Sequence, residues 1–142
     1  MMRKFMHTVI LSLTLLTLSS FVATKKSDFK FFAGTWKDLD HPNNSFVFTA
    51  EGTFYNISNE GSLQVITHSG NYKILPDHKY MVNITFARPN AKYSLLGKTY
   101  TNNYIIDRDK NSLKLTGTVE GSEGKSSLNW SNNLVRIEKL GD

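Results

Sequence analysis

The sequence predicts an all-β fold, an eight-stranded antiparallel up-and-down β-barrel preceded by a signal peptide. Most of the chain after residue 31 alternates apolar and polar residues in short runs, the period of strands with one buried face. Turn residues separate these runs at close intervals, so consecutive strands should pair antiparallel. The first run begins with Gly34-Thr35-Trp36. Gly34 lets the backbone bend, and Trp36 is large enough to plug one end of a barrel.

The first 23 residues have the pattern of an export signal. Arg3 and Lys4 precede a ten-residue apolar run at 9–18, and small residues follow it. That run is shorter than the roughly 20 residues that a membrane-spanning helix needs. An amphipathic N-terminal helix of the folded domain is the alternative, which the run disfavours because it is apolar on all sides. We therefore expect an exported protein, periplasmic or secreted, with no transmembrane segment in the mature chain.

The remainder divides into a flexible polar lead-in at 24–30 and a barrel domain at 31–142. Phe29, Phe31 and Phe32 are expected to fold over one end of the barrel in a turn or a single helical turn. The expected strands occupy residues 33–40, 45–50, 53–58, 63–75, 80–87, 98–107, 112–120 and 130–140.

Three features refine this scheme. Gly70 in the middle of the fourth strand predicts a bulge or a sharp bend. Residues 88–97 break the alternation and are expected to form a longer loop, a lid over one barrel mouth. Closure into a barrel removes exposed edges and leaves room for side chains or one small ligand, so we favour it over two stacked sheets.

Composition excludes several classes of function. The chain has 17 basic and 12 acidic residues, net +5; without Arg3 and Lys4 the counts are 15 and 12, net +3. These charges are scattered, whereas a nucleic-acid-binding protein would have a basic stripe with interleaved aromatic residues. Cysteine is absent, so there is no disulfide and no cysteine-ligated metal. A domain of this size must then rely on one continuous core.

Four short segments carry a resemblance to a known family: 32–37 (FAGTWK), 51–54 (EGTF), 67–72 (THSGNY) and 134–137 (LVRI). With them the chain resembles the lipocalin and calycin superfamily, and more narrowly the small exported lipocalin-like domains of bacteria whose function is uncharacterised. The likeness covers residues 31–140.

The resemblance implies a barrel in which Trp36 packs under a basic side chain in a cation–π contact. Arg136 is the residue that would supply it, so Gly34, Trp36 and Arg136 are the expected barrel-closure residues. The chain is shorter than typical lipocalins, and it has no disulfide and no predicted helix after the eighth strand. The structural role therefore carries over, and a particular ligand does not.

No pattern in the sequence predicts catalysis or a metal site. His41 and His78 lie in turns and His68 lies in a strand, without the spacing of metal ligands or an accompanying carboxylate cluster. No Gly-x-Ser-x-Gly elbow and no phosphate-binding glycine loop occur. We therefore expect no metal, no cofactor and no enzymatic activity.

Inward-facing aromatic and amide side chains are the candidates for ligand contacts. Large rings should fill most of a barrel this small, leaving at most a shallow apolar cup in which an amide serves as a polar anchor. His68 is either a satisfied interior histidine or a ligand contact. The candidate ligand-binding residues are His68, Tyr72, Tyr100, Asn102 and Tyr104.

These observations predict a non-enzymatic protein that binds a small apolar or amphipathic ligand at a barrel mouth near residues 88–97. The alternative is a filled barrel that acts as a protein-interaction or inhibitor module in the cell envelope.

Overall fold

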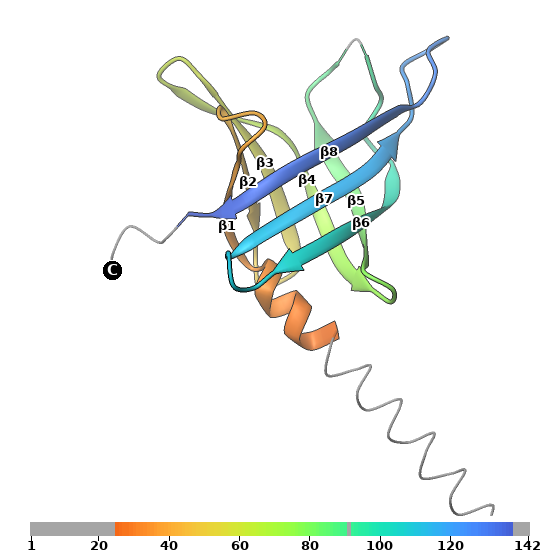
Figure 1. The fold of residues 1–142 in the computed structure, drawn as a ribbon. Helices are drawn as coiled ribbons and strands as arrows, with labels where there is room; N and C mark the ends of the chain where they lie inside the picture. The colour runs from red at the N-terminus through yellow and green to blue at the C-terminus, as the bar shows by residue number, and fades with distance from the viewer. Residues whose placement is uncertain (1–24, 91, 138–142) are drawn as a thin grey trace, which may run out of the picture.

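Eight strands close into one antiparallel barrel, in which each strand pairs with its neighbours in sequence and β1 also pairs with β8 (Figure 1). The computed structural model describes residues 25–90 and 92–137. The predicted all-β class and barrel topology are confirmed, and two stacked sheets are excluded. The strands are β1 (Gly34–Asp38), β2 (Asn44–Phe48), β3 (Thr53–Glu60), β4 (Leu63–Leu75), β5 (Lys79–Ala87), β6 (Thr99–Asp107), β7 (Ser112–Val119) and β8 (Leu128–Arg136).

The observed strand bounds follow the predicted ones closely. The fourth strand has the expected limits, Leu63–Leu75. The largest difference is in β8, which begins at Leu128 rather than at residue 130 and ends at Arg136. The expected signal peptide (1–23) and the last three residues of the expected eighth strand (138–140) lie outside the described residues.

Residues 25–32 form a helix of two turns, which the sequence analysis did not predict. It expected a flexible lead-in at 24–30 and at most one helical turn. The helix lies across one end of the barrel (Figure 1). Phe29 and Phe32 are three residues apart, so they share the face that packs on the barrel, where Phe32 is fully buried. Such a short helix gains its stability from this packing and not from helix propensity. The local sequence therefore did not predict it.

Two register shifts change the direction of side chains in β4 and β5. Asn56 pairs with His68 but Ile57 pairs with Ile66, so Thr67 is an extra residue in β4. Ser69 pairs with Phe86 but Gly70 pairs with Ile84, which confirms the irregularity predicted at Gly70. Each bulge moves the following residues of the strand to the other face.

The bulges turn two side chains away from the face that strict alternation would give them. Strict alternation places Phe86 on the face of Tyr80, Val82 and Ile84, but Phe86 is 47% exposed because the bulge lies between it and Ile84. Alternation also gives Ile66 the face of His68. Ile66 is 41% exposed, because Thr67 interrupts the period between them.

The core is aromatic and continuous from the N-terminal helix into the barrel. It consists of Phe32, Trp36, Phe48, Phe54, Tyr72, Ile74, Tyr80, Val82, Ile84, Tyr104, Leu113, Leu115 and Leu134. Below, "helix end" means the end of the barrel covered by residues 25–32, and "distal end" means the opposite one, where β1 ends and β2 begins.

Candidate functional site

The helix end is closed by hydrogen bonds to the last carbonyl groups of the helix. Arg136 Nη1 donates to the Ala33 carbonyl at 2.7 Å, and Nη2 donates to the Phe31 carbonyl. Trp36 Nε1 donates to the Phe32 carbonyl at 2.8 Å. Carbonyl groups at the end of a helix have no partner within it, so these two side chains cap three successive ones.

The same two side chains stack on each other. The Arg136 guanidinium carbon lies 4.2 Å from the centre of the Trp36 ring, which is the cation–π contact that the resemblance implies. Gly34 lies directly beneath, with a φ of +146°, and a Cβ atom there would be 2.2 Å from Arg136 Nη1. Gly34, Trp36 and Arg136 therefore act together, because the missing side chain of Gly34 lets Arg136 reach the helix.

A buried carboxylate ties the start of the helix to β6. Asp28, 6% exposed, accepts a hydrogen bond from Tyr104 Oη at 2.7 Å and pairs with Arg108 Nη2 at 2.8 Å. Burial, and then the hydrogen bond to Asp28, raises the pKa of Tyr104. Tyr104 is thus committed to holding the helix.

Tyr72 is also engaged at the helix end. Its ring stacks on Phe29 at a centroid distance of 5.3 Å, and its hydroxyl donates to the Thr49 carbonyl at 2.8 Å. Burial, with a smaller effect of Glu51, raises the pKa of Tyr72 to about 12. Tyr72 borders an open groove of about 600 Å³ beside the helix, which Lys25 also lines.

The distal half of the barrel interior has a different character, because polar side chains lie among the aromatic ones. Asn56 and His68 face each other across β3 and β4. Thr67 Oγ1 donates to Asn56 Oδ1 at 2.6 Å and lies 3.2 Å from His68 Nδ1. Burial lowers the pKa of His68 to about 4, so this histidine is neutral at physiological pH.

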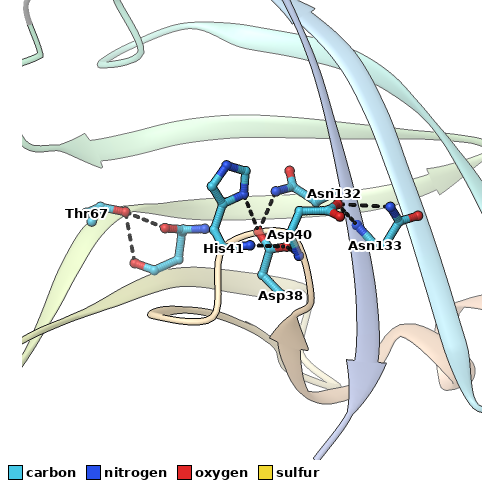
Figure 2. A network of polar contacts seen from close by, with 7 residues as sticks. Asp38, Asp40, His41, Thr67, Asn132 and Asn133 are labelled. Carbon is cyan, nitrogen blue, oxygen red and sulfur yellow. Dashed lines mark hydrogen bonds and ion pairs between the residues drawn. The ribbon is translucent and has the colours of Figure 1, made fainter.

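A second polar cluster surrounds Asp38, the last residue of β1 (Figure 2). Asp38 is fully buried and accepts hydrogen bonds from the backbone amides of Asp40 and His41. Its Oδ2 lies 3.2 Å from His41 Nδ1 and accepts from Asn132 Nδ2 at 2.6 Å. Asp40 in turn accepts from the backbone and side-chain nitrogens of Asn133. The cluster thus joins the β1–β2 connection to β8.

Asn102 on β6 and Trp130 on β8 contribute two atoms without partners. Among the described residues, Asn102 Oδ1 and Trp130 Nε1 are the buried side-chain atoms that form no hydrogen bond. Both groups approach Gly117 of β7, where a Cβ atom would be 2.2 Å from Asn102 Oδ1 and 2.8 Å from Trp130 Cζ2. The Asn102 oxygen and the Trp130 ring therefore both lie against Gly117 on the inner wall.

Tyr100 links the two long connections at the distal end. Its hydroxyl donates to the Ser94 carbonyl at 2.8 Å and accepts from the backbone amide of Glu120 at 3.3 Å. The 88–98 and 120–127 connections also meet in a bridge between Tyr93 and Gly121. Leu95 packs against the core, so the 88–98 connection contacts the barrel interior.

The structure separates the five residues proposed for ligand binding. Tyr72 and Tyr104 lie at the helix end, where both hydroxyl groups have protein partners. His68, Tyr100 and Asn102 lie in the distal half. Sequence analysis missed Asp38, Asn56 and Trp130 there. The available signal for Asp38 and Asn56 was a carboxylate or an amide at a position that alternation directs into the barrel.

The arrangement offers hydrogen bonding and apolar contact. Within residues 25–90 and 92–137, no group of three or more His, Cys, Asp or Glu side chains could hold a metal ion. In the same residues, no helix is long and apolar enough to cross a membrane.

These observations define a class: a small closed antiparallel barrel with one end sealed by an N-terminal helix and a mixed polar and aromatic lining in the other half. Residues 23–140 match the family described as Domain of unknown function (DUF4488), and the chain belongs to this family. No curated protein matches the chain.

Proposed function

We propose that this protein is an exported, non-enzymatic, lipocalin-like binding protein that takes a small apolar or amphipathic ligand into the distal half of its barrel. The observation that carries the proposal is the pair of buried, unpartnered atoms, Asn102 Oδ1 and Trp130 Nε1. Small-molecule sites are mostly apolar concavities with a few convergent polar groups. The distal half combines such groups with the partly buried rings of Phe46, Tyr100 and Trp130.

The contrast between the two ends supports this direction of entry. The helix end is occupied by Phe32, whose ring centre lies 5.0 Å from that of Tyr104 and 5.2 Å from that of Phe48. Phe32 therefore fills the helix end of the barrel interior, and the polar groups that lack partners lie in the other half. The proposal of export depends on the apolar run at 9–18 and its basic start.

The experiment is native mass spectrometry of the protein recovered from its own cell envelope. A thermal-shift panel of fatty acids, bile acids and haem accompanies it. We expect a retained or saturable ligand, and a matched variant, Gly117→Val, that binds it at least tenfold more weakly. The control is Thr118→Val, the next residue on β7, which is exposed. Equal binding by Gly117→Val, or no ligand in either assay, would contradict the proposal.

Export is tested separately by fractionating cells that express the full chain and a chain without residues 2–23. We expect only the full chain to leave the cytoplasm. Retention of both forms would refute this part of the proposal.

The alternative function, a protein-interaction or inhibitor module, is favoured by one feature of the outer wall. The two bulges leave Ile66 and Phe86 exposed on adjacent strands, β4 and β5, and outward apolar groups of this kind are common at protein interfaces. A pull-down from envelope extract with the wild type, Phe86→Lys and a shortened 88–97 loop tests it. A specific partner lost in both variants would support the alternative.

A further inference from the structure

We infer that the distal half contains a subsite for an uncharged group that donates one hydrogen bond and accepts another, formed by the Asn102 side-chain oxygen and the Trp130 indole N–H. The inference rests on the proposed function and specifies which part of the ligand enters deepest. The chemical class is a lactam, a primary amide or an alcohol attached to an apolar body.

Two buried side-chain atoms of the distal half are unsatisfied. Asn102 is 3% exposed and Trp130 packs against the core, yet Asn102 Oδ1 and Trp130 Nε1 have no partner among the described residues. Proteins rarely leave buried polar atoms unpaired, because such an atom has lost its hydrogen bonds to water without replacement. One atom is an acceptor and the other a donor, so an occupant satisfies both only if it carries the complementary pair.

The side chains of Asn102 and Trp130 both lie against Gly117. Gly117 pairs with Trp130 across β7 and β8, and the place of its absent side chain lies within 2.2 Å of Asn102 Oδ1 and 2.8 Å of Trp130 Cζ2. The two side chains therefore meet over the same glycine. Asn102 lies opposite Tyr80, with which it pairs across β5 and β6.

The two atoms favour an uncharged occupant. A carboxylate in this subsite would place its negative charge against the Asn102 oxygen, which repels it. An ammonium group would place its positive charge against the Trp130 N–H, which also repels it. Two basic side chains of the distal rim are engaged in ion pairs, since Arg88 pairs with Glu60 at 2.6 Å and Lys98 with Glu120 at 2.7 Å. An ion buried without a partner is strongly unfavourable, so the subsite selects an uncharged group.

The test uses the two indole N–H resonances of ¹⁵N-labelled protein, which belong to Trp36 and Trp130 and are assigned with Trp130→Phe. ε-Caprolactam presents an N–H and a carbonyl on one edge, and N-methylcaprolactam lacks the donor. We expect ε-caprolactam to shift the Trp130 resonance saturably, with a Kd about tenfold lower than that of its N-methyl analogue. The Trp36 resonance should stay in place, because Trp36 Nε1 is bonded to Phe32 at the other end.

Two variants complete the design. Asn102→Leu should weaken ε-caprolactam about tenfold and remove its preference over the N-methyl analogue. Asn103→Leu should change neither, because Asn103 is exposed on the same strand. If Asn102→Leu fails to fold, the comparison of the two lactams on the wild type decides alone. Equal affinities for the two lactams, or no shift at Trp130, would overturn the inference.

The two proposals can fail independently. If the lipid panel yields a ligand that Gly117→Val excludes, but the lactams are not distinguished, binding in the barrel stands and the polar subsite does not. If neither the panel nor the lactams bind, the buried atoms are bridged by water alone and both proposals fail.

Discussion

Replacing Phe32 with alanine tests whether the N-terminal helix is part of the barrel core. The Phe32 side chain is fully buried. Its ring centre lies 5.0 Å from that of Tyr104, 5.2 Å from Phe48, 5.5 Å from Tyr80 and 6.1 Å from Tyr72. The four surrounding rings come from four different strands, β2, β4, β5 and β6. Among the described residues, only Phe48 has as many aromatic neighbours.

The expected cost is large because the gap cannot close. Removing a buried phenylalanine typically costs about 3–5 kcal/mol, and the cost rises with the cavity that remains. The neighbouring rings are attached to strands whose spacing is set by their ladders, so they cannot collapse inward by much. The lost aromatic pairs, each worth roughly 0.5–1.5 kcal/mol, are part of that cost. We therefore expect Phe32→Ala to lie at the upper end of the range, a large part of the roughly 5–15 kcal/mol of a typical domain.

The assay is urea unfolding followed by circular dichroism, with Phe86→Ala as the control because Phe86 is 47% exposed. We expect Phe86→Ala to cost about 1 kcal/mol or less and the slope of the unfolding transition to be unchanged. If Phe32→Ala lowers the midpoint no more than Phe86→Ala does, the helix is not part of the cooperative unit. The account of the closed end would then be wrong.

Three further predictions address the other features. Burial lowers the pKa of His68 from 6.5 to about 4, so the unfolded chain binds the proton first as pH falls. Stability should be intact above about pH 6.5 and decline by up to roughly 3 kcal/mol toward pH 4. His68→Asn should abolish that decline in pH-dependent unfolding, and His78→Asn should retain it. Arg136→Lys should lower the free energy of unfolding by roughly 1–3 kcal/mol in the same urea assay. A lysine ammonium cannot replace a guanidinium that donates to two carbonyl groups and stacks on the Trp36 indole. An unchanged free energy of unfolding would contradict the capping role. Gly70→Ala should cost about 1–3 kcal/mol, since its Cβ would lie 1.9 Å from the Asn83 carbonyl oxygen. A retained β4–β5 register with unchanged stability would refute this.

The barrel could be predicted because its strands carry their own signal. Each strand has one face buried in the barrel and one face exposed to solvent. The inward positions of β4, such as Tyr72 and Ile74, therefore alternate with polar ones. The turns between strands are rich in glycine, asparagine and proline. Closure then follows from the number of strands and the absence of a long crossover.

The helix could not be predicted because its stabilising contacts are distant in sequence. Asp28 is held by Tyr104, 76 residues away, and the Phe31 carbonyl is bound by Arg136, 105 residues away. A local reading of residues 24–30 finds charge and no apolar period. The bulge at Thr67 was hidden for a related reason, because only the pairing of β3 with β4 reveals the additional residue.

The candidate site was predicted in part because its residue types are ambiguous from sequence. Tyr72, Tyr100 and Tyr104 all alternate inward, and nothing local distinguishes a hydroxyl that anchors a helix from one that pins a loop. The difference lies in which end of the barrel each occupies. That is decided by strand direction: β4 ends where the helix packs, whereas β6 begins at the distal end and reaches Tyr104 only near the helix end.

The two ends of the barrel also differ in how their polar groups are satisfied, and this difference bears on function. At the helix end, Asp28, Trp36, Tyr104 and Arg136 all have partners, so these polar groups serve stability. In the distal half, Asn102 and Trp130 each retain an unpaired atom. A core under selection for stability alone would be expected to replace such groups with apolar side chains, because an unpaired buried polar atom is destabilising. Local violations of this rule are expected where a protein gives up stability for function, which is the reason for proposing a ligand site in the distal half.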